Sequence, residues 1–107
     1  MPDDRPPFDV SSRQDEGGLF LAVRGEIDMA TGDEFRAELL AAVAGGGRVV
    51  VDLSGIAFMD STGLGVIIDA AKKSRYGDLV IRAPSRPVRR LFDVSGVAPL
   101  FVLEIPE

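Results

Sequence analysis

Positions 49–66 read VVVDLSGIAFMDSTGLGV, an apolar run followed by a polar, glycine-bearing loop and the start of a second apolar pattern. The run from Arg48 to Leu53 is short, almost continuously apolar and rich in β-branched residues, which is typical of a strand covered on both faces and central in a sheet. From Ser61 to Arg75, apolar residues recur at the period of an amphipathic helix. The stretch therefore predicts a strand, a loop and a helix in direct succession.

The rest of the chain continues this alternation of strand and helix patterns. Strands are expected near 8–12 and over 19–27, 48–53, 79–83 and 100–105, and helices from 31 to the glycines at 45–47, over 61–75 and after 84–87. Strands that alternate with helices imply right-handed crossovers and parallel neighbours, with the first hairpin antiparallel at one side. We predict an α/β fold with a four- to five-stranded mixed sheet flanked by three or more helices.

Length, charge and hydropathy limit the classes of protein to which the chain can belong. Its 107 residues predict one domain over 1–107, with residues 1–7 as a flexible N-terminal tail. The net charge of −5 argues against direct nucleic acid binding, which needs many Lys and Arg on phosphates. No apolar run approaches the roughly 20 residues that span a bilayer, and the proline-rich N-terminus lacks the features of a signal peptide. A cytoplasmic protein without membrane insertion is expected.

The sequence lacks the residues and motifs that most catalytic sites need. The chain has no cysteine and no histidine, so thiolate metal sites, cysteine nucleophiles and the usual base near neutral pH are absent. The segment Asp60–Gly63 superficially resembles the Asp-Ser/Thr-Gly of aspartic proteases, but its glycine comes one residue late. No serine-hydrolase elbow surrounds Ser61, and the glycines at 45–47 lack the ending of a phosphate-binding loop. We expect no enzyme, no catalytic residue, no metal ligand and no cofactor.

The loop before the helix over 61–75 has two interpretations. Asp60, Ser61 or Thr62 can cap the helix, because each side chain can accept from free N–H groups of the first turn. Gly63 and Gly65, however, each cost about 1 kcal/mol of helix stability relative to Ala. Two glycines at this place favour a surface left bare for the close approach of another backbone.

Helical phase predicts which residues of this helix meet a partner. The expected core face carries Leu64, Ile67, Ile68 and Ala71, and the expected outer face carries Thr62, Val66, Asp69 and Lys73. Val66 is the apolar member of the outer face and follows Gly65. The predicted partner contacts are Thr62, Gly63, Gly65 and Val66.

A second loop, Gly25–Thr31, is expected at the same edge of the sheet. Functional loops of open α/β sheets lie at the carboxyl ends of parallel strands, so Asp28 should lie near Asp60 and Ser61. Asp28 either caps the helix that begins near Met29, which is the favoured interpretation, or modulates Ser61 electrostatically. Asp60 either caps its own helix or orients the serine hydroxyl, and both aspartates are candidate partner contacts.

Residues 49–66 resemble the signature of the STAS family of anti-sigma factor antagonists. Gly25-Glu26-Ile27-Asp28 resembles the family's first conserved block, and Val88–Phe92 followed by Ser95-Gly96 resembles its C-terminal helix. The resemblance covers residues 8–105 and implies a STAS-like fold.

The resemblance also implies a function. Members of this branch bind a serine-kinase-type anti-sigma factor and so release a sigma factor, in stress-response or sporulation signalling. Phosphorylation of the serine that follows the Asp, here Ser61, ends the binding, and a serine phosphatase reverses it. The alternative is a STAS module that does not switch and acts as an adaptor in a larger signalling or transport assembly.

Overall fold

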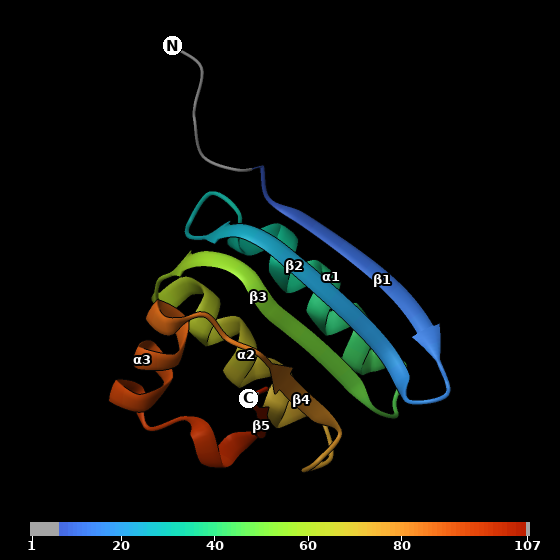
Figure 1. Ribbon diagram of the computed structural model, residues 1–107. Coiled ribbons are helices and arrows are strands. Elements are labelled where there is room, and N and C mark those ends of the chain that lie inside the picture. Colours follow the sequence, from blue (N-terminus) through green and yellow to red (C-terminus); the bar gives the residue numbers. More distant parts are fainter. Residues whose placement is uncertain (1–6, 107) are drawn as a thin grey trace.

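Five strands and three helices make up the computed structural model, which describes residues 7–106 (Figure 1). The strands are β1 (Asp9–Asp15), β2 (Gly18–Ile27), β3 (Val49–Met59), β4 (Leu79–Arg82) and β5 (Val102–Glu104). The helices are α1 (Gly32–Ala44), α2 (Ser61–Lys73) and α3 (Arg86–Ser95), with a 3-10 turn at Ala98–Leu100. This order confirms the predicted alternation. The predicted tail at 1–7 lies outside the described residues except for Pro7.

The strands form one mixed sheet in the order β1-β2-β3-β4-β5, so that β3 is central as predicted. β1 and β2 form an antiparallel hairpin, whereas β2, β3, β4 and β5 are parallel. Each parallel strand adds on the same side of its predecessor, so right-handed crossovers bring the connecting helices to one face. Figure 1 shows α1 and α2 behind the strands.

The core lies between this helical layer and one face of the sheet. Val49, Val51 and Leu53 of β3 are buried against it, whereas Val50 and Asp52 between them are only half-buried. The expectation that this strand is covered on both faces is therefore wrong. Its apolar run is continuous because Val50 belongs to an apolar row on the open face.

β3 is also longer than predicted, because it runs through Ser54-Gly55 to Met59. β2 accompanies it to the end, with register shifts between Ala22 and Arg24 and between Gly25 and Glu26. A Cβ on Gly55 would lie 2.6 Å from Arg24 Cγ, so any other residue there would displace the Arg24 side chain beside the β-bulge. The extension carries the loop before α2 past the end of β4.

The helices are short, and α1 and α2 have 13 residues each. Within residues 7–106, no helix has the length and apolar character needed to cross a membrane.

Candidate functional site

The loops after β2 and β3 lie side by side at the carboxyl edge of the sheet. Ile27 pairs with Met59 in the parallel register, and the Asp60 N–H donates to the Ile27 carbonyl over 3.1 Å. The loop that contains Asp28 is thereby held next to Asp60 and Ser61. The predicted meeting of the two loops is confirmed.

Asp60 caps α2. Its backbone is extended, and its Oδ1 accepts a hydrogen bond of 2.8 Å from the Thr62 N–H. Ser61, the first residue of the helix, is exposed to solvent. The cap leaves the serine hydroxyl at the helix N-terminus, where free N–H groups favour an anion.

Asp28 organises the turn that leads into α1. Its Oδ1 accepts from the N–H groups of Ala30 (2.9 Å) and Thr31 (3.2 Å). The Thr31 hydroxyl donates to the Glu26 carbonyl over 2.8 Å and accepts from the Asp28 N–H over 3.0 Å. The favoured prediction that Asp28 caps the helix is wrong, because α1 begins at Gly32 with Thr31 as its N-cap, and Asp28 instead holds the turn before it. The electrostatic influence of Asp28 on Ser61 stays a prediction.

The two glycines of α2 lie in different surroundings, one buried and one half-exposed. Gly63 is buried, and a Cβ there would lie 2.6 Å from Met59 Cγ and 2.7 Å from Ile27 Cγ2. Its prediction as a partner contact is wrong, because the space it leaves is filled by this chain's own strands. Gly65 is half-exposed, and a Cβ there would meet no atom within 4 Å. Gly65 therefore stays a candidate contact.

The helix α1 lies along one side of α2 and determines which face of α2 is exposed. The methyl group of half-buried Thr62 lies so close to Gly32 that a Cβ on that glycine would overlap it. Further along, Arg36 Nη1 and Asp69 Oδ2 form an ion pair of 2.9 Å. The side of α2 predicted to face a partner thus faces α1, and Thr62 is mainly an interhelical contact.

Val66 lies on this covered side. It is 1 % exposed and belongs to the core, so its prediction as a partner contact is wrong. The predicted outer face assumes that α2 packs on the sheet only. In the structure α2 packs on both the sheet and α1, so a larger part of its surface is buried.

The exposed surface of α2 is a different line of residues. At about 100° per residue, positions four, three and four apart fall on one side of a helix. Ser61, Gly65, Ile68 and Lys72 have this spacing, and none of them is buried. We call these four residues the α2 stripe. Ile68, predicted as core, packs against the core only in part and is the apolar residue of the stripe.

Two large apolar side chains near the loops were not predicted as site residues. Met29, in the loop after β2, is 85 % exposed, and Phe58, near the end of β3, is 47 % exposed. The only signal in the sequence is that each adjoins a loop at the carboxyl edge. In the described part of the chain, no group of three or more acidic side chains is arranged to hold a metal.

Comparison with known proteins agrees with this fold. The family model described as "Mlab, STAS domain" matches residues 10–104. The chain belongs to the STAS family. This STAS domain is 32 % identical over 92 residues to the anti-sigma-B factor antagonist of Bacillus subtilis, with 84 % of each chain covered. It is 30 % identical over 103 residues to the anti-sigma F factor antagonist of Paenibacillus polymyxa, covering 90 % of this chain and 88 % of that one.

A solved structure shows the same architecture. An anti-sigma factor antagonist from Mycobacterium paratuberculosis superposes on the STAS domain with a TM-score of 0.84 and 26 % identity, over 92 % of this chain and 86 % of that chain. The mixed sheet and three helices predicted from the sequence are thus those of the family.

Proposed function

We propose that this STAS domain is an anti-sigma factor antagonist that is switched off by phosphorylation of Ser61. In its unmodified form it binds an anti-sigma factor of the serine-kinase type and so releases the sigma factor. The names of its relatives support the class of partner. Such a regulator acts in the cytoplasm and is not itself an enzyme, because the kinase catalyses transfer of the γ-phosphate of ATP to the serine and releases ADP.

The observation that carries the proposal is an exposed Ser61 at the N-terminus of α2, directly after its capping Asp60. A phosphoserine adds about −1.5 to −2 charges at pH 7, and a helix N-terminus tolerates an anion. The domain therefore stays folded when it is modified. The effect of the phosphate falls on the complex and not on the fold.

The α2 stripe is the surface on which the phosphate acts. Gly65 leaves the backbone bare one turn after Ser61, and Ile68 offers an apolar contact one turn further. An interface that fits a neutral hydroxyl must displace or desolvate a dianion, at a cost of several kcal/mol. A cost of about 4 kcal/mol corresponds to roughly a thousandfold loss of affinity.

Two partners act on Ser61 in this scheme. The anti-sigma kinase phosphorylates the serine in the complex and then dissociates, and a serine phosphatase restores the binding form. The Thr62 hydroxyl is the less suitable acceptor, since its side chain lies half-buried against Gly32.

The test is calorimetric titration against each purified serine-kinase-type anti-sigma factor encoded in the same genome, first with ADP and then with ATP, followed by intact-mass analysis. We expect binding with ADP, and one added phosphate and dissociation with ATP. Ser61→Ala should bind and not be released, Ser61→Asp should bind more weakly, and Thr62→Ala should behave as the natural protein. Binding without phosphate transfer would identify a constitutive adaptor instead.

A further inference from the structure

The face of the sheet opposite the helices carries an ordered pattern of side chains that the proposed function does not use. The strand register aligns one residue of each strand in a row that crosses the whole sheet: Arg13, Phe20, Val50, Val80 and Val102. We call this the apolar row. Its three valines and Phe20 adjoin one another, and Val80 in their midst is only 2 % exposed.

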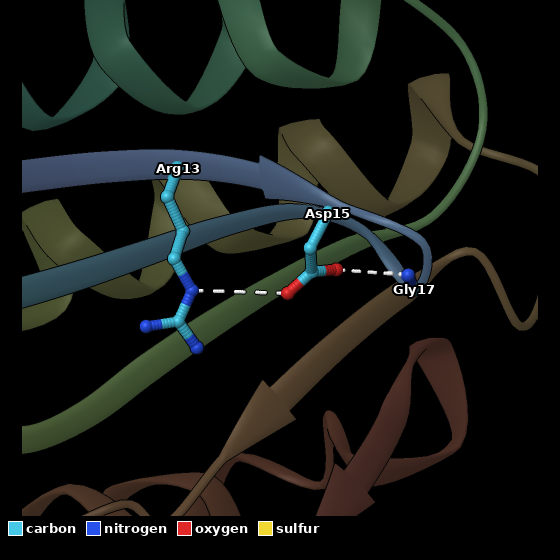
Figure 2. A network of polar contacts seen from close by, with 3 residues as sticks. All are labelled: Arg13, Asp15 and Gly17. Atoms are coloured by element: carbon cyan, nitrogen blue, oxygen red, sulfur yellow. Dashed lines mark hydrogen bonds and ion pairs between the residues drawn. The ribbon is translucent and has the colours of Figure 1, made fainter.

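Arg13 closes the β1 end of the apolar row. Its guanidinium lies 4.6 Å from the centroid of the Phe20 ring, a cation–π contact. Its Nε lies 3.7 Å from Asp15 Oδ2, and the other oxygen of that carboxylate accepts from the Gly17 N–H over 2.8 Å (Figure 2). The charge at this end of the row is thus matched within the chain.

Charged side chains flank the row on both sides. Two residues before Val50, Arg48 stands exposed at the entry of β3. Two residues after Val50, Asp52 lies opposite Arg82 in the register of β3 and β4, and Arg82 Nε lies 3.2 Å from Glu104 Oε1. An open depression of ≈ 270 Å³ lies between the two flanks, over Phe20 and Val50.

We propose that this open face binds a second copy of the chain by a two-fold axis along the apolar row. Such an axis lays the two apolar rows on each other and exchanges the two charged flanks. It brings Arg48 over Asp52 of the second copy. This pair occurs twice, and both contacts join opposite charges.

A two-fold axis along β3 would also stack these faces, and the charges oppose it. It would place Arg48 on Arg48 of the second copy and Asp52 on Asp52, and like charges that meet in an interface cost several kcal/mol. The charge pattern therefore favours the axis along the apolar row over the axis along β3. It also favours a second copy over a strongly charged partner, because positive and negative side chains alternate across the face.

The size of the face indicates a weak dimer. Five strands about 4.8 Å apart and three rows about 7 Å apart cover roughly 24 × 20 Å, so pairing two faces buries on the order of 1,000 Å². This is the lower end for a specific interface. Because α2 lies on the helical face, both copies keep the α2 stripe free for the anti-sigma factor.

Sedimentation velocity from micromolar to millimolar concentration tests the dimer. The natural chain should show a reversible monomer–dimer equilibrium, and Arg48→Asp, which places Asp over Asp52, should weaken it by about tenfold or more. Arg89→Asp is the matched control, because Arg89 is exposed on α3 and undergoes the same change of charge. Far-UV circular dichroism and thermal unfolding of each variant exclude loss of the fold.

Charge exchange tests the axis itself. The double variant Arg48→Asp/Asp52→Arg should recover the dimer, and an equimolar mixture of Arg48→Asp with Asp52→Arg should form a mixed dimer. A natural chain that stays monomeric at millimolar concentration would overturn the proposal. So would an Arg48→Asp dimer as strong as the natural one, or a double variant that does not recover. Phosphorylation of Ser61 should leave the dimer unchanged, which keeps this test separate from the proposed switch.

Discussion

The methyl group of Thr62, in the first turn of α2, lies directly against the backbone of Gly32, the first residue of α1. The contact fixes the approach of the two helices at the edge that carries Ser61. A residue with a Cβ at position 32 would have to move α1, α2 or the threonine.

Replacement of this glycine tests the contact. We expect Gly32→Ala to destabilise the domain by about 1–3 kcal/mol through overpacking, although Ala is the better helix former. Gly32→Ala/Thr62→Ser should recover most of the loss, because serine lacks the methyl group. Urea unfolding of the four proteins in this double-mutant cycle gives the coupling. Additive effects would show that the two residues do not press on each other.

Gly65 should respond in the opposite way. A Cβ there meets nothing within 4 Å, so Gly65→Ala should stabilise the domain by about 0.5–1 kcal/mol through helix propensity. The same methyl group stands on the α2 stripe and should weaken binding to the anti-sigma factor by about tenfold, or ~1.4 kcal/mol. Thermal unfolding and titration calorimetry measure the two effects. Tighter or equal binding would remove Gly65 from the interface.

Val66 and Ile68 make a matched pair of aspartate substitutions. Val66→Asp buries a carboxylate between α1 and the sheet and should cost about 3 kcal/mol or more of stability. Ile68→Asp should keep the fold and weaken binding, since the side chain lies on the α2 stripe. Circular dichroism followed by titration of the folded variant decides between them. A folded, tightly binding Ile68→Asp variant would place the interface elsewhere, for example around exposed Met29.

The cap of α2 can be tested without changing the serine. Asp60→Ala removes the acceptor of the Thr62 N–H and should cost about 1 kcal/mol of stability. Asp60→Asn keeps an acceptor oxygen and should cost much less. Phosphate transfer to both variants, measured with the anti-sigma kinase, reports the second possible role of Asp60. If Asn supports the fold and still slows transfer, the carboxylate also orients the Ser61 hydroxyl.

The order of strands and helices follows from the sequence because each element has its own hydrophobic period, and the place of Ser61 follows from the loop between β3 and α2. The exposed face of α2 does not follow. Val66 and Ile68 are both apolar and two positions apart, and only the position of α1 buries one and leaves the other half-exposed.

The different roles of the two glycines in α2 were also not predictable from the sequence. Gly63 and Gly65 lower the stability of a helix by the same amount relative to Ala. The sequence does not reveal that Gly63 is the one that packs against the strands of its own chain. Val49 and Val51 are buried, whereas Val50 is half-buried on the open face. This difference was not predictable, because three consecutive valines have the same sequence pattern whether one or both faces of the strand are covered.

The agreement between chain order and strand order in the sheet affects how the domain is made. From β2 onward, every strand lies next to the strand synthesised just before it, so no strand waits for a distant partner. Each parallel pairing closes a crossover of about 20 residues, a shorter loop than pairing with a more distant strand would close. The growing chain can therefore assemble the sheet strand by strand from the β1–β2 hairpin during translation. The Ser61 edge is complete once α2 has emerged, before β5 has been synthesised.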